Sequence, residues 1–416
     1  MSPHDQRATR VVVIAFFTLF LDLAGVGIIL PMLPLYVRSM HGTAETVGVL
    51  FACFSFTQLI ATPILGRLSD RYGRRRVMLL SLAGNAASMV LFAVATQSRL
   101  LPLLFVSRII AGATAGNISA CQAAVADVTE GAERAKAMGR VNAGIGLGMV
   151  VGPALGSFAA ALGPAGPPLA AAALAAIDLV AAFFLMPETL VVTRTLSAES
   201  PYRGPQASAP PPLLLRMRAL AAEPRLRPIF LLYFLTFFYL TALQVNLALL
   251  ANARLGWQEA ETARMFTLFG VLGLVVQGGL IGPLTRAFGA QNLVIVGAVA
   301  STAGLLGISE AYSTWALLLG LTLLGIGFSL TNPLLSTIAS ERAGRSQQGV
   351  VLGLGQSAGG AARTVGPLIM GAVYTRVGAT AAFQTGALAA FLASDDASYM
   401  QGAVIAADGG WTVPAR

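Results

Sequence analysis

Three of the charged side chains within the long apolar segments of this sequence are candidates for proton transfer. Asp22, Arg108 and Asp178 each have mostly aliphatic neighbours along the chain. A charge in such surroundings is expensive to maintain and is usually functional. A buried carboxyl group can bind and release a proton, so Asp22 is the first candidate for proton transfer. We expect Arg108 to tune that acid or to hold a charge partner. Asp178 is expected to be a second proton site or to pair with a neighbour.

A second group of charges lies between two apolar segments, where residues 66–76 read GRLSDRYGRRR. Gly66 and Gly73 predict sharp turns, because glycine adopts backbone conformations that other residues avoid. Asp70 is surrounded by arginines and must be paired or solvated. Asp127 is a candidate partner for Arg71 or Arg74. These charges form either a latch that opens and closes or an ordinary basic loop.

Small residues dominate the segment GLGMVVGPALG at 146–156. Gly148, Gly152 and Gly156 recur every fourth residue, a spacing that lets two helices approach closely. Pro153 predicts a bend in the same helix. We expect either a hinge against the helix near 263–284 or plain helix packing.

Polar and aromatic side chains scattered along the apolar segments are candidates for a substrate-binding wall. Aromatic faces with few hydrogen-bonding groups suit amphipathic, aromatic or cationic compounds. Lipid contact or core packing is the alternative for each aromatic residue, and a charge pair or packing for the arginine. The candidates are Gln58, Asn117, Tyr233, Phe237, Phe238, Gln244, Gln277, Asn332, Gln356 and Arg363.

The composition indicates which elements carry these residues. The chain has 416 residues, of which 56% are hydrophobic and only 11% charged. Such a chain has too little polar surface for a soluble globule, which excludes a soluble enzyme and a free nucleic-acid binder. The net charge of +9 comes from arginines in short loops and does not indicate nucleic acid. With His4 and His41 as the only histidines and two cysteines in apolar segments, we predict no metal or cofactor and no disulfide.

Apolar stretches of about 20 residues predict an all-α membrane protein with twelve helices, eleven full and one short. A proline-rich and arginine-rich stretch divides them into two six-helix halves. The halves echo each other, since glycines seven residues apart occur at 66–73 and at 282–289. The predicted domains are 1–187, a cytoplasmic linker at 188–226, 227–393 and an atypical tail at 394–416. The predicted helices are 11–36, 45–66, 77–96, 101–124, 139–162, 168–187, 227–251, 263–284, 291–309, 313–336, 347–373 and 379–393.

The arginines also indicate how the chain is oriented in the membrane. Most of them fall in loops that lie on one side if the N-terminus is cytoplasmic. The first apolar run is longer than the core of a cleavable signal peptide, so it is read as the first membrane helix.

Taken together, these motifs resemble the major facilitator superfamily. GRLSDRYGRRR is similar to its loop 2–3 signature, and GLGMVVGPALG resembles the antiporter signature of drug–proton exchangers. Arg108 in helix 4, LDLAGVGIILPMLPLY at 21–36 and PET at 187–189 are similar to the branch with tetracycline and multidrug exporters. In this family the acid at Asp70 caps the N-terminus of helix 11 and latches the two halves, and the arginine at Arg108 is tied to proton transfer.

The resemblance implies a transporter and not an enzyme. Its partners would be protons, a small-molecule substrate and the lipid bilayer of a bacterial inner membrane, and it would work as a monomer by alternating access. Ser88 stands where tetracycline exporters carry an acid, so tetracycline is not the expected substrate. An uptake facilitator for a sugar, organic acid or peptide, and a transport-impaired fusion product, are the alternatives.

The last residues resemble a different family. FLASDDASYMQGAVIAADGGWT at 391–412 is similar to the end of a short-chain dehydrogenase, which forms a strand and a subunit contact there. The Tyr-x-x-x-Lys motif of that family is missing, because Lys136 follows Ala132 by four residues. No dehydrogenase activity is therefore expected. The twelfth helix keeps about 15 apolar residues, or about 22 Å, against a hydrocarbon layer of about 30 Å.

Overall fold

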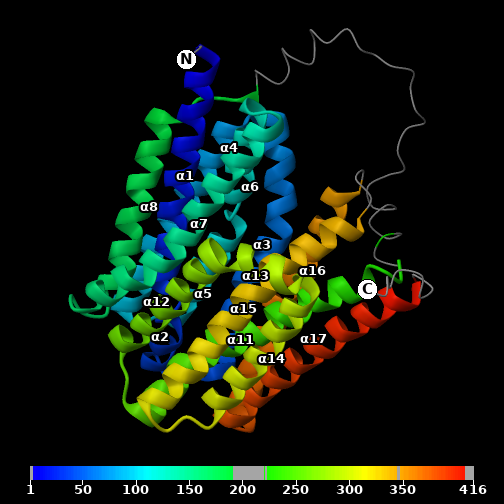
Figure 1. Cartoon of the computed structure of the whole chain (residues 1–416). Helices are drawn as coiled ribbons and strands as arrows, with labels where there is room; N and C mark the ends of the chain where they lie inside the picture. Colours follow the sequence, from blue (N-terminus) through cyan, green and yellow to red (C-terminus); the bar gives the residue numbers. More distant parts are fainter. Residues whose placement is uncertain (1–2, 191–219, 221–222, 344–346, 408–416) are drawn as a thin grey trace. The chain divides into compact units, whose positions relative to one another are not determined.

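The computed structural model describes residues 3–190, 220, 223–343 and 347–407 (Figure 1). Every regular element in those ranges is a helix, as the sequence predicts. The chain forms two compact units, Met1–Ala209 with Ala251–Gly270 and Pro210–Leu250 with Val271–Arg416. Most of the predicted linker at 188–226 lies outside the described residues.

The first unit is built from helices that cover the predicted segments up to residue 187. Their bounds are α1 (Pro3–Ile29), α2 (Leu33–Ser39), α3 (Ala44–Tyr72), α4 (Arg74–Ser98), α5 (Leu101–Ala113), α6 (Asn117–Val128), α7 (Gly131–Ala160) and α8 (Gly166–Leu185). In this unit α1 packs on α6, α7 and α8, and α4 packs on α5, α6 and α8. Figure 1 shows α1 beside α7 and α8.

The remaining helices begin at residue 227. They are α11 (Arg227–Leu255), α12 (Glu259–Val275), a π-helical turn η1 (Val276–Leu280), α13 (Ile281–Phe288), α14 (Ala290–Ser309), α15 (Thr314–Arg342), α16 (Gln348–Arg376) and α17 (Ala379–Ala407). In the second unit α14 packs on α15 and α17, and α16 packs on α15 and α17. The end of α11 and the first part of α12 belong to the first unit.

Within the described residues, ten helical spans are long and apolar enough to cross a membrane, by length and composition. They correspond to the first ten predicted segments. The apolar part of α17 is shorter, Ala379–Ser394, in line with the predicted short twelfth helix.

Three segments that the sequence predicts as single helices are interrupted. The first predicted helix is divided into α1 and α2 near Pro31. The fourth is divided into α5 and α6 at residues 114–116, and the eighth contains η1. Proline explains the first interruption, because it removes a backbone hydrogen bond and its ring collides with the preceding turn.

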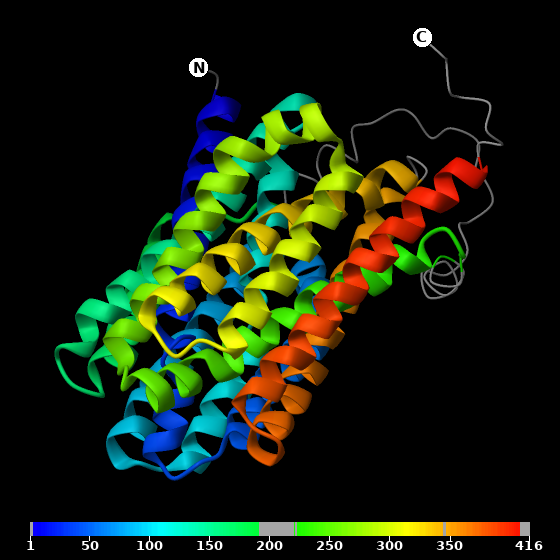
Figure 2. The same cartoon turned by 60° about the horizontal axis from the view of Figure 1, so that its bottom comes forward.

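Two predictions from the sequence are wrong in detail. Gly66 does not form a turn, because α3 continues as helix to Tyr72, and the turn is made by Gly73 alone. The backbone after Ser394 remains helical to Ala407, where the resemblance to a dehydrogenase implied a strand. Figures 1 and 2 show α17 in red as one continuous helix.

Apolar packing at one end of the first unit holds its helices together. Val11, Leu19 and Leu82 are fully buried there with residues of α6, α7 and α8. This packing holds α1 and α4 in place through α6 and α8, on which both pack, and these two helices carry the acid and the amide described next.

Candidate functional site

Asp22 lies at the centre of a polar cluster inside the first unit. The Nδ2 of Asn85 in α4 donates a hydrogen bond to Oδ1 of Asp22 in α1 over 2.6 Å. The side chain of Asn117, the first residue of α6, also hydrogen bonds to Asp22. Two amide groups from two other helices therefore hold the carboxylate. The predicted substrate residue Asn117 thus belongs to the acid cluster.

Asp178 in α8 lies near this cluster and has few polar contacts. It is 1% exposed and feels the negative charge of Asp22. Thr18, one turn before Asp22 in α1, is the hydroxyl next to it. Neither carboxylate oxygen of Asp178 has a hydrogen bond of normal geometry within the described residues. The structure thus brings together two of the three intramembrane charges that the sequence singles out.

Arg108 lies elsewhere in the unit. Its guanidinium carbon is 4.9 Å from the centre of the Phe92 ring, and its Nη2 contacts Met89 and Ser107. Within the described residues it forms no ion pair, and its Nε has no hydrogen bond. The expected charge partner is therefore replaced by an aromatic face, which attracts cations in apolar surroundings.

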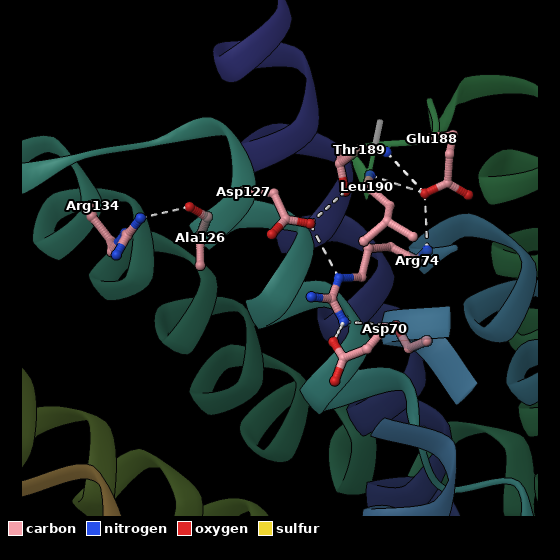
Figure 3. Close-up of polar contacts among 9 residues, drawn as sticks. Asp70, Arg74, Ala126, Asp127, Arg134, Glu188, Thr189 and Leu190 are labelled. Carbon is pink, nitrogen blue, oxygen red and sulfur yellow. Dashed lines mark hydrogen bonds and ion pairs between the residues drawn. The ribbon is translucent and has the colours of Figure 1, made fainter. Parts of the chain in front are cut away.

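Arg74 joins the charged residues at the end of α3 and the start of α4 (Figure 3). Its guanidinium bonds to Asp70 through Nη1 and to Asp127 Oδ2 through Nε, the latter over 3.1 Å. The Oγ1 of Thr189 donates to the same Asp127 oxygen over 3.1 Å. Of the two predicted partners of Asp127, the structure pairs it with Arg74. Arg71 lies over the ring of Tyr72, 5.4 Å from its centre.

Glu188 completes this network, and sequence reasoning missed its role. Its Oε1 accepts hydrogen bonds from the backbone N–H groups of Arg74, Thr189 and Leu190 at 2.9, 3.0 and 3.2 Å (Figure 3). Gly73 has a φ of +110°, and a Cβ there would lie 2.2 Å from Glu188 Oε2. The PET motif was the available signal, since Glu188 is its middle residue.

The three glycines of α7 face α1, an arrangement that fits the alternative of plain helix packing for these positions. A Cβ on Gly148 would lie 2.5 Å from the Phe20 carbonyl oxygen, and one on Gly152 2.4 Å from the Ala24 carbonyl oxygen. Gly156 approaches Ile28 in the same way, at 3.1 Å. This row of three glycines therefore lets the backbones of α1 and α7 come into contact.

Other parts of α7 contact α12 instead. The Oγ of Ser157 donates to the Ala260 carbonyl oxygen over 3.2 Å, and Gly270 lies against Val150. Pro153 does not break α7, which runs through it, and its ring packs against Gly27 in α1.

Aromatic side chains of α11 pack into glycines of α16 in the second unit. A Cβ on Gly355 would lie 2.6 Å from the Tyr233 ring, and one on Gly359 2.6 Å from the Phe237 ring. The guanidinium of Arg363 lies over Phe237, 4.5 Å from the ring centre. This places two predicted substrate residues, Phe237 and Arg363, in direct contact.

The other predicted substrate residues lie apart from these clusters. Tyr233 is fully buried and its hydroxyl hydrogen bonds to that of Ser336 over 2.8 Å. Phe238 stacks on Phe234. Within the described residues, no side-chain hydrogen bond joins the remaining predicted residues to the Asp22 cluster or to Arg363; they are Gln58, Gln244, Gln277, Asn332 and Gln356. Gln277 lies in the π-helical turn η1.

Comparison with known proteins shows which family has this architecture. A profile of the Major Facilitator Superfamily matches residues 15–308 and, in a second match, 229–394. Multidrug resistance protein 2 of Bacillus subtilis is 29% identical over 379 residues, 90% of each chain. The class C tetracycline resistance protein of Escherichia coli is 29% identical over 90% of this chain and 92% of its own. Major facilitator superfamily domain-containing protein 10 of Bos taurus is 31% identical over 90% of each chain.

Solved structures agree with this result. The human organic anion transporter MFSD10 superposes with a TM-score of 0.67 at 28% identity, covering 95% of this chain and all of the other. The nucleoside transporter NupG has a TM-score of 0.74 at 15% identity, which shows a shared fold. The predicted two-half bundle of membrane helices is confirmed, and the chain belongs to the major facilitator superfamily.

Proposed function

We propose that this protein is a proton-coupled efflux transporter for small amphipathic or aromatic compounds. The observation that carries the proposal is the carboxylate of Asp22, inside an apolar unit and hydrogen bonded to Asn85 and Asn117. A buried acid held by neutral amides has no permanent counter-charge, so a proton is the simplest group to neutralise it. We place it in a bacterial inner membrane with the N-terminus in the cytoplasm, acting as a monomer without enzymatic activity.

Protonation of Asp22 changes how α1 is held. An ionised carboxylate accepts stronger hydrogen bonds than a neutral acid does, so a bound proton weakens its contact with Asn85. Because α1 also touches the α7 backbone along Gly148, Gly152 and Gly156, a shift of α1 is passed to α7. In this proposal proton binding and helix movement are linked through α1, and Asp178 is a second proton site.

The network around Arg74 would act as a latch in the same cycle. Asp70, Asp127 and Glu188 converge on one short segment at the start of α4. An arginine shared between two acids can keep one bond while it exchanges the other. Such a group suits a junction that must open and close many times.

The substrate class follows from the side chains available to bind it. Phe237 and Phe238 on α11 present aromatic surface that favours planar, apolar compounds. Relatives with 29% identity are named for multidrug and tetracycline resistance, which supports export of drug-like molecules. Ser88 stands where tetracycline exporters carry an acid, which argues against tetracycline as the substrate.

Transport of organic anions is a second candidate. Arg363 lies over Phe237 and forms no ion pair within the described residues, so its charge is available to a carboxylate. A relative of 28% identity has a solved structure described as an organic anion transporter. Phe237 and Arg363 together would hold the ring and the charge of an aromatic acid.

Dye accumulation in inside-out membrane vesicles tests the proposal. Respiring vesicles that contain the protein should accumulate ethidium, and a protonophore should release it. Asp22→Asn should abolish the accumulation, whereas Glu133→Gln, at an exposed position in α7, should leave it unchanged. Accumulation by Asp22→Asn at the normal rate would overturn the proposal.

A further inference from the structure

A cavity of about 580 Å³ lies between the end of α7 and the start of α12, both within the first unit. Its volume is in the range of about 300–1,000 Å³ that is typical of small-molecule sites. At the cavity, the Oγ of Ser157 in α7 donates a hydrogen bond to the Ala260 carbonyl oxygen over 3.2 Å. Further along both helices, Gly270 of α12 lies against Val150 of α7. These contacts hold the two helices that form the cavity walls.

Charged side chains of both signs line this cavity. Glu259, Glu261 and Arg264 all come from the first two turns of α12. Glu261 accepts a hydrogen bond from the backbone N–H of Gln258 over 3.1 Å. Within the described residues, neither Glu259 nor Arg264 forms an ion pair. The cavity therefore offers one carboxylate and one guanidinium to a ligand that carries both a positive and a negative group.

The two charges lie at different depths. The candidate membrane span of α7 ends at Ala160 and that of α12 begins at Glu259, so the cavity lies at a membrane surface. Arg264 follows Glu259 by five residues, which is about 7.5 Å along the helix axis. Beyond Arg264 the helix continues as MFTLFGVLGLV, without a charged residue. From water towards hydrocarbon the order is thus carboxylate, guanidinium and apolar helix.

One wall of the cavity is apolar and exposed. Phe158 lines the cavity and is 79% exposed. Gly156, two residues earlier, faces α1, so Phe158 points about 200° away from that contact. Leu155, about one turn deeper in α7, is also exposed. Exposed apolar side chains on the outside of a membrane helix bundle contact acyl chains, so this wall suits a ligand that carries one.

We propose that the cavity binds one phospholipid with a primary amine in its head group, such as phosphatidylethanolamine. In this lipid the amine is outermost, the phosphate lies deeper and the acyl chains follow, which is the order of Glu259, Arg264 and the apolar wall. The ammonium group donates up to three hydrogen bonds to carboxylates, and a guanidinium matches the geometry of a phosphate. In the proposed orientation the lipid belongs to the outer leaflet.

The charges also predict which head groups the cavity disfavours. Phosphatidylcholine carries methyl groups in place of the N–H donors, so it forms no hydrogen bond with Glu259. Phosphatidylglycerol has no positive group and would place its phosphate near Glu259 and Glu261 without compensation. A preference for the primary amine is therefore the property that defines the site. This inference goes beyond the proposed function and does not depend on it.

Native mass spectrometry of the purified, delipidated protein in detergent tests the site. The protein is titrated separately with phosphatidylethanolamine, phosphatidylcholine and phosphatidylglycerol that have identical acyl chains. Glycerophosphoethanolamine, the head group without acyl chains, is the fourth ligand. The spectra give the Kd of the first bound molecule in each titration.

We expect the wild-type protein to bind phosphatidylethanolamine about tenfold more tightly than the other two lipids, a difference of about one charge-assisted hydrogen bond. Glu259→Gln should bind it no more tightly than phosphatidylcholine. Arg264→Gln should weaken both of these lipids about tenfold and keep their ratio, because both carry the same phosphate. Glu133→Gln and Arg10→Gln, at exposed positions near the starts of α7 and α1, are the matched controls and should keep the wild-type affinities.

Equal affinities of the wild-type protein for the three lipids would overturn the proposal, and this comparison needs no variant. A preference for phosphatidylethanolamine that survives in Glu259→Gln would also overturn it. Binding of glycerophosphoethanolamine as tight as that of the lipid would show a site for a soluble amine phosphate instead. None of these results affects the efflux proposal, which dye accumulation tests separately.

Discussion

Asn85 in α4 donates a hydrogen bond from Nδ2 to Oδ1 of Asp22 in α1 over 2.6 Å. The bond joins two helices through a neutral amide, so Asp22 is held in place without a cation. In the proposed cycle, a proton on this carboxylate weakens the bond to Asn85 and so links protonation to the position of α1.

Removal of the Asn85 side-chain amide should impair transport only because Asp22 loses its hydrogen bond. Hydrogen bonds to charged groups contribute about 1.5–3 kcal/mol, so Asn85→Ala should lower proton-driven dye accumulation by a factor of about 10 to 150. In the Asp22→Asn background the same change should have no further effect. Because Asp22→Asn alone should abolish accumulation, the double-mutant cycle is measured in the free energy of unfolding of the purified variants, and equal losses in both backgrounds would show that Asn85 acts elsewhere.

The contact between α1 and α7 should tolerate no side chain at Gly152. A Cβ there would lie 2.4 Å from the Ala24 carbonyl oxygen, whereas nothing lies within 4 Å of one on Gly146 in the same helix. Gly152→Ala should therefore lower the free energy of unfolding by about 2 kcal/mol. Gly146→Ala is the matched control and should lose nothing. Thermal unfolding of the purified variants checks the difference, and similar midpoints for both would contradict the packing.

The turn between α3 and α4 should likewise require glycine. Gly73 has a φ of +110°, and its missing Cβ leaves room for Glu188. We expect Gly73→Ala to destabilise the protein by about 1–3 kcal/mol, because the residue would be strained and would displace that carboxylate. Glu188→Gln, which keeps the space and one acceptor oxygen, should cost less. Unfolding midpoints that rank the two variants in the opposite order would argue against this geometry.

Arg363 should distinguish anionic from cationic substrates. If its guanidinium on Phe237 binds carboxylates, Arg363→Gln should reduce fluorescein transport about tenfold, because one charge-assisted hydrogen bond to the substrate is lost. Transport of ethidium, a cation, should be unchanged. Vesicle uptake of the two dyes, measured side by side, tests this. Equal losses for both dyes would indicate a structural role for Arg363.

The helical architecture could be predicted from the sequence because membrane helices are long apolar runs. The interruption at residues 114–116 could not, since those residues are compatible with helix and only the packing of Gly84 on Thr114 reveals it. Asp22 and Asp178 stood out as charges in apolar segments. Their neighbours Asn85 and Asn117 depend on which helix faces contact each other, and one sequence does not determine this.

The same limit applies to the contacts of Gly148, Gly152 and Gly156 and to the network around Arg74. Four-residue spacing predicts that Gly148 and Gly152 lie in a helix contact, but it does not name the partner helix. Glu188 follows the last apolar residue of α8 and bonds to a backbone group more than a hundred residues earlier, over 2.9 Å. Contacts at such sequence separation leave no local pattern to find.

Proton movement driven by substrate tests the central claim most directly. The protein is reconstituted into liposomes that contain a pH-sensitive dye, and an amphipathic substrate such as ethidium is added with no other gradient. We predict a change of internal pH with the wild-type protein, and none with Asp22→Asn although that variant still binds ethidium. A pH change of normal size with Asp22→Asn would show that another group carries the proton.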